Sequence, residues 1–357
     1  MKRIILTGGG TAGHVTPNIA MIPRLQELGY DVVYIGSYDG IEKKLIEDIG
    51  IPYYGISSGK LRRYFDLKNF TDPFRVQKGY HEAIKLIQEL KPSVVFSKGG
   101  FVCVPVVAAA GKAGIPVLIH ESDMSPGLAN KLCIRFARKI CCNFPETVSS
   151  LPKDKAVLTG TPIRRELLKG DAQSGRQLCG FSDDKPVLLV MGGSQGSAAV
   201  NACIREALPE LLCDFQVVHL CGKGKLDEEL NGTEGYRQFE YIQDELPDLF
   251  AMADLVVSRA GANAICELLA LAKPNLLIPL SAQASRGDQI LNARSFEKQG
   301  YSCVLEEEEI TSALLVQQIR QLYEERKRYT AQMLQGPHFD SIEAIVSLIE
   351  ACCVNTD

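Results

Sequence analysis

Residues 2–14 read KRIILTGGGTAGH, and this stretch decides the fold of the 357-residue chain. A short β-branched and aliphatic run leads into a glycine turn with the spacing G-x-G-x-x-G. Apolar residues then recur at helical spacing over residues 17–28, and a second strand-like run follows at residues 31–35. Strand, glycine turn, helix and strand in this order predict a βαβ unit.

The same order appears again roughly 180 residues further along the chain. An apolar run at residues 187–191 leads into the turn GGSQGS at residues 192–197, and a helical pattern and a strand follow at residues 198–212 and 216–220. Two such units predict an α/β protein made of two Rossmann-like, doubly wound parallel-sheet domains that face each other across a cleft.

The domain junction is predicted near Gly160-Thr161-Pro162. We therefore expect an N-terminal domain over residues 1–162 and a C-terminal domain over residues 163–339. A final helical pattern, over residues 340–357, is expected to pack back on the first domain. The glutamates Glu306–Glu309 are interpreted as the solvated start of an acidic helix that extends to Lys327.

Polar and glycine-rich residues follow several of the other predicted strands. In open parallel sheets the carboxyl ends of the strands meet at one edge, where ligands bind. We therefore expect binding residues in these segments. They are Lys98-Gly99-Gly100, His120-Glu121-Ser122-Asp123, Ser258-Arg259-Ala260-Gly261 and Pro279-Leu280.

The charge of the chain is unevenly distributed. The formal net charge is −4, but residues 1–162 carry 21 Lys and Arg against 14 Asp and Glu, whereas the remainder carries 18 against 29. A basic half favours an anionic partner on that side, and the near-neutral total gives no support for a nucleic-acid-binding protein.

The twelve cysteines are scattered, with no C-x-x-C and no zinc-ligand spacing. The N-terminus lacks the apolar run of a secretory signal, so we expect a cytosolic chain with reduced thiols. The most apolar stretch, residues 101–119, is broken by two prolines, a lysine and a glycine, and is not expected to span a membrane.

The second glycine turn suits a nucleotide diphosphate, because backbone N–H groups and the Ser194 hydroxyl can donate to phosphate oxygens. Arg164 follows the junction and adds a guanidinium that binds phosphate at two points. The chain has no D-x-D, so no metal and no cofactor is expected. The alternative is a turn that serves only tight strand–helix packing.

The first glycine turn is also typical of anion binding, but a dehydrogenase is disfavoured, because the second strand ends in Gly36-Ser37-Tyr38 without the acidic residue that holds the ribose. His14 follows the turn, where an imidazole can act as a general base. His120-Glu121 is a second candidate pair. The alternative for His14 is an ordinary core or surface histidine.

Basic and bulky apolar residues interleave at residues 61–65, 68–70 and 73–78. If they are exposed, this surface suits an anionic lipid bilayer, with Arg62, Arg63, Arg75 and Lys78 as its cations. The alternative is an ordinary surface loop whose long side chains cover apolar groups.

Seven short motifs across both halves, in this order, resemble the MurG family, glycosyltransferase family 28, the undecaprenyldiphospho-muramoylpentapeptide β-N-acetylglucosaminyltransferases. The similarity covers nearly the whole chain. The motifs are Gly8–Asn18, Lys98–Pro105, His120–Lys131, Gly160–Arg164, Gly192–Gly196, Ser258–Glu267 and Asp288–Ala293.

The resemblance implies a GT-B fold and a metal-independent hexosyltransferase. It implies transfer of GlcNAc from UDP-GlcNAc to the C4 hydroxyl of the MurNAc in lipid I, undecaprenyl-diphospho-MurNAc-pentapeptide. The product is lipid II, formed with inversion, for peptidoglycan synthesis. It also implies a peripheral location on the cytoplasmic face of the cell membrane. The alternatives are another metal-independent GT-B glycosyltransferase, a UDP-GlcNAc 2-epimerase, and a nucleotide-sugar-binding protein without catalysis.

Site residues also follow from the resemblance. His14 and Glu121 are implied near the acceptor hydroxyl, with His14 as the expected base. The chain departs from the family pattern at Asp123, at Asn263-Ala264 and at Asp288. The implied UDP-GlcNAc contacts are Thr11, Ala12, Gly13, Arg164, Ser194, Ile242, Glu267 and Gln289.

Overall fold

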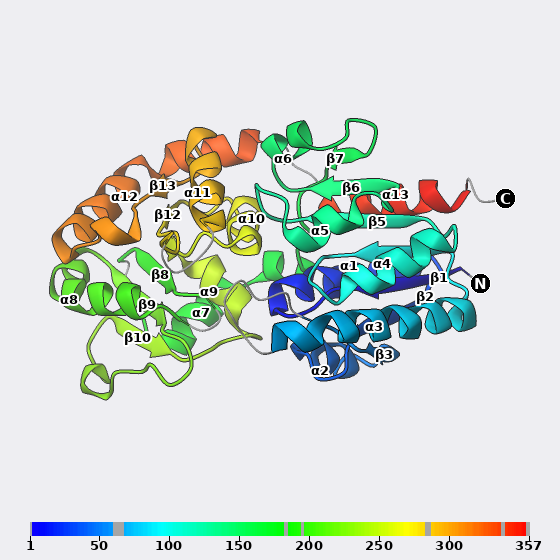
Figure 1. The fold of residues 1–357 in the computed structure, drawn as a ribbon. Helices are drawn as coiled ribbons and strands as arrows, with labels where there is room; N and C mark the ends of the chain where they lie inside the picture. Colours follow the sequence, from blue (N-terminus) through cyan, green and yellow to red (C-terminus); the bar gives the residue numbers. More distant parts are fainter. Residues whose placement is uncertain are drawn as a thin grey trace. The chain divides into compact units, whose positions relative to one another are not determined.

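The computed structural model describes residues 2–59, 68–181, 185–193, 196–282, 287–336 and 340–354. The chain divides into two compact units. Unit 1 comprises Met1–Arg164 and Phe339–Asp357, and unit 2 comprises Arg165–His338. Each unit is built on one sheet whose strand pairs are all parallel, with helices beside it (Figure 1). This confirms the predicted α/β class with two doubly wound sheets.

Over the described residues, the sheet of unit 1 has seven strands in the order β3-β2-β1-β4-β5-β6-β7. The order reverses beside β1, so the chain winds first to one side of this strand and then to the other. The strands are β1 (Arg3–Thr7), β2 (Asp31–Ser37), β3 (Tyr53–Ile56), β4 (Val94–Ser97), β5 (Val117–Glu121), β6 (Lys139–Cys142) and β7 (Ala156–Leu158).

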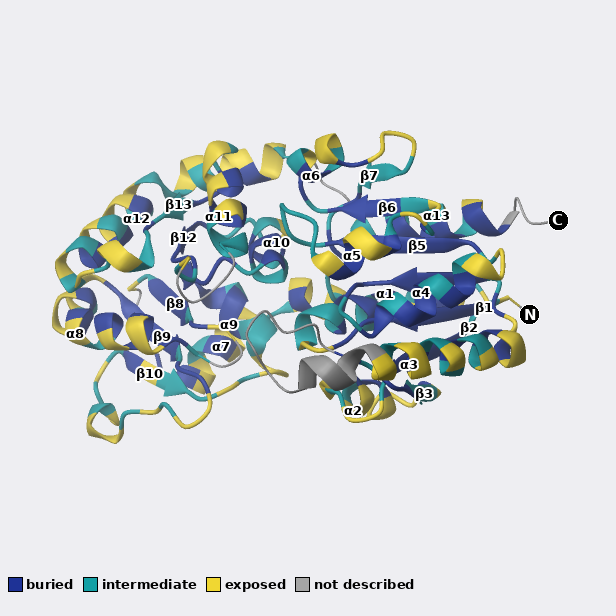
Figure 2. Cartoon of the chain, viewed as in Figure 1, coloured by how far each residue is buried: buried dark blue, intermediate teal, exposed yellow. Residues whose placement is uncertain are grey.

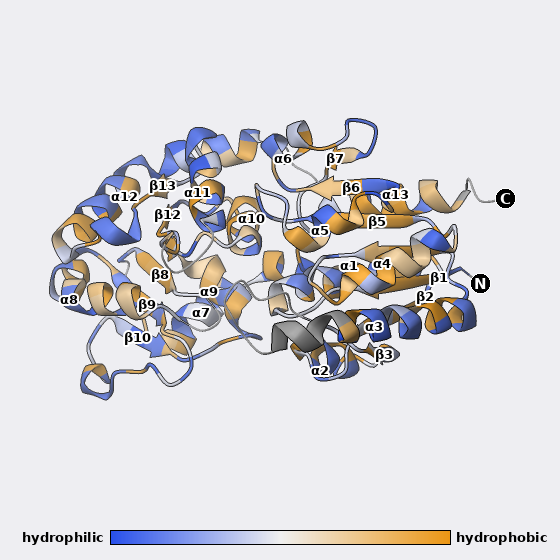
Figure 3. Cartoon of the chain, viewed as in Figure 1, coloured by the Kyte–Doolittle hydropathy of each residue, from blue (hydrophilic) through white to orange (hydrophobic). Residues whose placement is uncertain are grey.

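Helices cover the sheet of unit 1, and its central strands are buried and apolar, whereas the edge strands β3 and β7 are only partly buried (Figures 2 and 3). One core cluster joins α1 and α13 to the sheet, and a second joins α3 and α4 to it. The helices are η1 (Ala12–His14), α1 (Thr16–Glu27), α2 (Ile41–Glu47), α3 (Lys68–Leu90), α4 (Cys103–Lys112), α5 (Leu128–Cys133), α6 (Pro145–Ser150) and α13 (Ser341–Val354).

Helix α13 belongs to the core of unit 1 although it comes after unit 2 in the chain. Ile342, Ile345 and Ile349 recur at helical spacing and are buried against the cluster that contains Met21 and Leu25 of α1. The helix is therefore held chiefly by burial of one apolar face.

In the part of unit 2 that the structure describes, the sheet has six strands in the order β10-β9-β8-β11-β12-β13. They are β8 (Val187–Met191), β9 (Gln216–Leu220), β10 (Tyr236–Phe239), β11 (Leu255–Ser258), β12 (Asn275–Leu277) and β13 (Cys303–Val304). The helices are η2 (Arg165–Lys169), α7 (Ala172–Cys179), α8 (Ala198–Asp214), η3 (Glu228–Leu230), α9 (Leu246–Met252), α10 (Ala262–Ala270), α11 (Asp288–Lys298), η4 (Glu307–Glu309) and α12 (Ser312–Gln335).

The predicted helix over residues 306–327 is wrong at both ends. Thr311 caps α12, because its hydroxyl accepts a hydrogen bond from the Leu314 N–H at 3.2 Å, and the helix continues to Gln335. Glu307–Glu309 form a separate 3₁₀ turn. Of the described residues, no helix is both long and apolar enough to cross a bilayer.

Candidate functional site

The candidate acceptor residues meet at one edge of the sheet of unit 1. Strands β1, β4 and β5 are adjacent and parallel, so their carboxyl ends lie side by side. The glycine turn follows β1, Lys98 follows β4, and Glu121 ends β5. Parallel pairing therefore brings together residues that lie more than 100 positions apart in the sequence.

The turns after β1 and β4 approach each other closely. The Gly9 N–H donates to the Gly99 carbonyl at 3.4 Å. Gly100 has a φ of +91°, and a Cβ at this position would overlap the Gly9 carbonyl oxygen. Both the backbone conformation and the lack of space require glycine at position 100.

The anion held by the first glycine turn belongs to the protein itself. The carboxylate of Glu42, which is fully buried, accepts a hydrogen bond from the Gly10 N–H at 3.2 Å. It also accepts from the N–H of Ser37 at 3.0 Å and from the Ser37 hydroxyl. The expectation that this turn binds an external anion is therefore wrong for the Gly10 amide, because Glu42 already occupies it.

His14 is held in one tautomer by the same turn. Its Nδ1 lies 3.1 Å from the Gly9 carbonyl oxygen and 3.2 Å from the Thr11 hydroxyl. A carbonyl oxygen only accepts, so Nδ1 carries the proton and Nε2 carries the lone pair. Burial, with a smaller contribution from the charge of Lys98, lowers the pKa of His14 to about 4. The imidazole is therefore neutral at pH 7 and able to accept a proton.

His120 is occupied in a buried hydrogen-bond chain. Its Nε2 donates to the Gly160 carbonyl at 2.9 Å, and its Nδ1 accepts from the Nζ of Lys98 at 3.0 Å. Lys98 also donates to the Ser122 hydroxyl. Burial and the charge of Lys98 lower the pKa of His120 well below its usual value. Both ring nitrogens are used, so the geometry gives His120 a structural role.

Glu121 organises the loop that follows β5. Its carboxylate accepts from the N–H of Asp123 at 3.1 Å, from the N–H of Gly127 at 3.0 Å and from the Nδ2 of Asn130 at 2.8 Å. The side chain is buried, and this burial raises its pKa. Two donors from the loop and one from α5 satisfy the carboxylate, so His14 has the geometry of a base and Glu121 that of a loop clamp.

The second glycine turn joins β8 to α8 in unit 2. Gly196 has a φ of +68°, and a Cβ there would overlap the Cys221 carbonyl oxygen. The Gly196 N–H donates to the Gly193 carbonyl at 2.9 Å, which closes the turn. The Ser197 hydroxyl caps the 17-residue helix α8 by accepting from the Val200 N–H at 3.3 Å. Ser194 lies outside the described residues.

Arg259, which follows β11, ties together the loops at the carboxyl edge of this sheet. It is buried and donates to the carbonyls of Ile278 at 3.0 Å and Pro279 at 3.2 Å. It also donates to the Ser197 hydroxyl at 2.6 Å and forms an ion pair with Glu307. The helix-cap residue of the second turn is thus held by a side chain from the neighbouring strand.

The interpretation of Glu306–Glu309 as a solvated helix start is therefore wrong in a second respect. The Glu307 side chain is only 15% exposed, and it accepts from the Ser281 N–H at 3.1 Å as well as from Arg259. Glu306 pairs with Arg294 at 2.6 Å. Glu307 thus holds loops at the sheet edge, and Glu306 pairs with a side chain of α11.

The other residues implied for the donor site are distributed as follows. Glu267 lies on α10, after β11, and is partly buried. Gln289 lies in the first turn of α11, where its Oε1 accepts from the Leu280 N–H at 3.0 Å. Ile242 is partly buried in the loop after β10. Arg164, half-buried, is the last residue of the first segment of unit 1.

The remaining implied positions, Thr11, Ala12 and Gly13, follow β1 at the carboxyl edge of the sheet of unit 1. Thr11 is exposed, and Ala12 and Gly13 begin η1 and are partly buried. Among the positions that depart from the family pattern, Asp123 lies in the loop clamped by Glu121, Asn263 and Ala264 lie in the first turn of α10, and Asp288 begins α11. In the part of the chain that the structure describes, no group of three or more His, Cys, Asp or Glu side chains could hold a metal ion.

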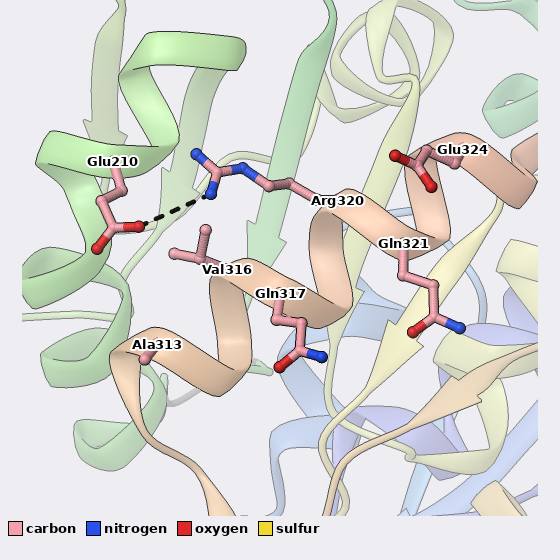
Figure 4. A pocket seen from close by; sticks show the side chains of 7 residues that line it. All are labelled: Glu210, Ala313, Val316, Gln317, Arg320, Gln321 and Glu324. Atoms are coloured by element: carbon pink, nitrogen blue, oxygen red, sulfur yellow. Dashed lines mark ion pairs between the residues drawn. The ribbon is translucent and has the colours of Figure 1, made fainter.

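A cavity of about 370 Å³ lies elsewhere in unit 2, between α8 and α12 (Figure 4). Arg320 spans it and pairs with Glu210 at 3.8 Å and with Asp214 at 2.8 Å. Exposed ion pairs of this kind contribute little to stability, and none of the predicted site residues lines the cavity. It therefore has no part in the candidate site.

Comparison with known proteins gives matches over both units. The family model described as the glycosyltransferase family 28 N-terminal domain matches residues 4–142, and the C-terminal domain model of that family matches residues 187–345. A relative from Lachnospira eligens is 65% identical over 98% of this chain and 99% of its own length. One from Clostridium tetani is 59% identical over 98% of both chains. Both are named UDP-N-acetylglucosamine–N-acetylmuramyl-(pentapeptide) pyrophosphoryl-undecaprenol N-acetylglucosamine transferase.

Solved structures agree at the level of fold. The crystal structure of Acinetobacter baumannii MurG superposes with a TM-score of 0.79 at 27% identity, over 98% of this chain and 100% of that chain. A UDP-N-acetylglucosamine 2-epimerase from Listeria monocytogenes gives a TM-score of 0.74 at 12% identity, over 100% and 98%. The predicted GT-B fold is confirmed, and the epimerase shares the fold alone.

Proposed function

Since the chain belongs to glycosyltransferase family 28, we propose that it transfers GlcNAc from UDP-GlcNAc to lipid I and so forms lipid II for peptidoglycan synthesis. The observation that carries this function is the 65% identity, over 98% of the chain, to a relative named for that transfer. The acceptor atom is the C4 hydroxyl of MurNAc, and the anomeric configuration is inverted.

Most of the residues proposed for donor binding belong to unit 2, and Arg164 is the last residue of the first segment of unit 1. The N-terminus of α8, with its positive dipole end, follows the second glycine turn and suits a diphosphate. Ser194 and Arg164 contact the diphosphate, Ile242 presents its backbone to the uracil, Glu267 binds the ribose and Gln289 contacts the sugar. In support, Glu267 and Gln289 lie on helices that begin at the carboxyl edge of the sheet, where α8 also begins.

The reaction is a direct displacement. The Nε2 lone pair of His14 takes the proton of the acceptor hydroxyl while that oxygen forms a bond to the anomeric carbon. The bond from the anomeric carbon to the β-phosphate oxygen breaks, and UDP leaves with the bonding electrons. The second glycine turn and Arg164 stabilise the charge that develops on the diphosphate. Thr11, Ala12 and Gly13 contribute backbone beside the reacting sugar.

The test is transfer itself. Labelled UDP-GlcNAc and lipid I are incubated with the purified chain, with EDTA in one arm and Mg²⁺ in another. Formation of labelled lipid II at equal rates in both arms is the expected result. Hydrolysis or 2-epimerisation of UDP-GlcNAc without transfer would instead support the alternatives that share this fold.

A peripheral location on the cytoplasmic face of the membrane accompanies this function. The relatives are named for a pyrophosphoryl-undecaprenol acceptor, which is a lipid. On α3, Phe74 is 74% exposed, and Arg75 and Lys78 are exposed beside it. All twelve cysteines are free thiols, which suits a reducing compartment. Arg62 and Arg63, the other cations of the predicted membrane surface, lie outside the described residues.

Neutralising two of these cations is expected to weaken membrane binding. Each basic side chain near an anionic bilayer contributes about 1 kcal/mol, so the double variant Arg75→Gln/Lys78→Gln should bind anionic vesicles about tenfold to thirtyfold more weakly. Co-sedimentation with vesicles of increasing phosphatidylglycerol content measures this. Turnover of a soluble lipid I analogue should be unchanged.

The matched control carries the same change in net charge on unit 2. Lys223→Gln/Lys327→Gln removes two exposed lysines and should leave vesicle binding within about twofold of the parent. Equal binding by the two double variants would contradict a membrane surface on α3.

A further inference from the structure

Two buried charges of opposite sign act on His14, and the transfer mechanism uses neither. Glu42 reaches the site from α2 and is fully buried, and Lys98 reaches it from the end of β4 and is 1% exposed. Buried carboxylates and ammonium groups are uncommon because both lose hydration. Packing alone therefore does not account for the buried pair Glu42 and Lys98 near the imidazole of His14.

Glu42 acts on His14 through the glycine turn. Its carboxylate joins the Gly10 N–H to the N–H of Ser37, and so ties the turn after β1 to the end of β2. A Cβ at Gly9 would lie only 2.6 Å from the Glu42 carboxylate, so the turn sits directly on this side chain. The carbonyl of Gly9 is the group that accepts from the Nδ1 of His14. The Glu42 carboxylate thus holds the backbone of the glycine turn, and this backbone in turn orients the imidazole of His14.

Lys98 acts from the adjacent turn. Its backbone N–H donates to the Thr7 carbonyl at 2.8 Å, and its Nζ is held by His120 and the Ser122 hydroxyl. The next residue, Gly99, is in contact distance of the ring, because a Cβ there would lie 3.6 Å from the Cδ2 of His14. The charged groups that act on His14 from the elements packed around it are Lys98 and Glu42, and they do so in opposite senses.

We propose that Glu42 and Lys98 are positioning residues for His14. Glu42 locks the glycine turn so that Nδ1 keeps its proton and Nε2 remains the accepting atom. Lys98 holds the adjacent turn, and its positive charge adds to burial in disfavouring the charged form of the imidazole. This inference rests on the proposed role of His14 in the transfer.

Histidine-selective ¹⁵N NMR on the full chain tests the proposal without relying on activity. The chain has only five histidines, and the His14 signals are identified by their loss in His14→Gln. In Lys98→Met the pKa of His14 should rise from about 4 towards its ordinary value of 6.5, because a nearby positive charge has been removed, and it should stay below 6.5, because burial, the larger cause of the shift, remains. The acid limb of the pH profile of kcat/KM should move up with it.

Glu42→Gln is expected to act differently. The amide keeps the shape of the side chain but offers one acceptor oxygen in place of two, so either the Gly10 or the Ser37 N–H loses its partner. The ring of His14 should then populate both neutral tautomers, its pKa should not rise, and kcat should fall by about tenfold or more. The KM for UDP-GlcNAc should change less than kcat, since most of the residues proposed for donor binding lie on unit 2.

Lys112→Met is the matched control, because it removes an exposed lysine from α4 of the same unit. It should leave the His14 titration unchanged. Circular dichroism and thermal unfolding check the fold of every variant, and Lys98→Arg, which retains the charge, replaces Lys98→Met if that variant does not fold. Lys98→Arg should keep the His14 pKa low.

Two results would overturn the inference. One is a His14 pKa that is unchanged in folded Lys98→Met or raised in Lys98→Arg. The other is a single Nδ1–H tautomer with normal kcat in Glu42→Gln. Failure of the proposed function has a different signature. Near-normal transfer by His14→Ala would show that His14 is not the base, while the NMR titration of His14 would still report the effects of Glu42 and Lys98.

Discussion

Replacing His14 with alanine is expected to lower kcat for GlcNAc transfer by about 10²- to 10⁴-fold, the usual contribution of a positioned general base. The ring is held by the Gly9 carbonyl and the Thr11 hydroxyl through Nδ1, so Nε2 is the basic atom. Binding of UDP-GlcNAc should persist, since the residues proposed for it lie mainly on unit 2. Single-turnover transfer and calorimetric UDP-GlcNAc binding separate the two effects.

The control is His81→Ala, which removes an exposed histidine on α3 and should leave kcat near the parent value. A His14→Ala variant with near-normal kcat, together with a Glu121→Ala variant that has none, would transfer the role of base to Glu121. That outcome would require the Glu121 carboxylate to exchange its hydrogen bonds from Asp123, Gly127 and Asn130 for one from the acceptor hydroxyl.

The pH dependence of transfer follows from the lowered pKa of His14. A neutral imidazole is the active form, and with a pKa of about 4 it persists as the pH falls well below 6.5. Activity that depends on His14 is therefore expected above pH 4 to 5 and lost as the pH falls through about 4. An acid limb near 6.5 would show that the ring is charged more easily than its burial implies.

Replacing Gly196 with alanine is expected to disrupt the donor site of unit 2. A non-glycine residue in a left-handed conformation costs about 1–2 kcal/mol, and the overlap with the Cys221 carbonyl oxygen adds to it because backbone cannot rotate away. We expect the free energy of unfolding to fall by about 3 kcal/mol or more. The Kd for UDP-GlcNAc should rise at least about tenfold as the turn is displaced.

Gly193→Ala is the matched control in the same turn. Gly193 has a φ of +85°, but a Cβ there would have no atom of the described residues within 4 Å. It should therefore show only the backbone strain, about 1–2 kcal/mol. Urea unfolding of both variants measures the difference, and equal losses would mean that the contact with Cys221 relaxes without cost.

The fold could be predicted from the sequence because its signals are local. The apolar runs that predict β8 and β9 have the same bounds as the strands, and α1 and α8 lie within two residues of their predicted ends. Each glycine turn lies between a strand and a helix, as in any βαβ unit. The start of α12 was misplaced because a run of glutamates has helical propensity, while the capping hydroxyl of Thr311 is a weaker signal.

The candidate site could be predicted only in part, because its partners are brought together by strand pairing. Glu42 and Gly10 are 32 positions apart, and Glu307 and Arg259 are 48 apart, with no periodic pattern to connect them. Adjacent residues of a strand point to opposite faces, so His120 and Glu121 do not form a pair despite their order. Nothing in the sequence around Glu42, which follows Gly40 by two residues, predicts that its carboxylate contacts the first glycine turn.

Helix α13 has a consequence for how the chain is made. Ile342, Ile345 and Ile349 complete the core of unit 1, but a ribosome synthesises them only after all of unit 2 has been translated. Domains usually form in the order in which they emerge. Here unit 2 is a continuous segment and can fold before unit 1 is complete. Until α13 has been synthesised, the apolar surface that it covers on β1 and β4 of unit 1 stays exposed. A chaperone that shields that surface during translation would therefore act on the older half of the nascent chain.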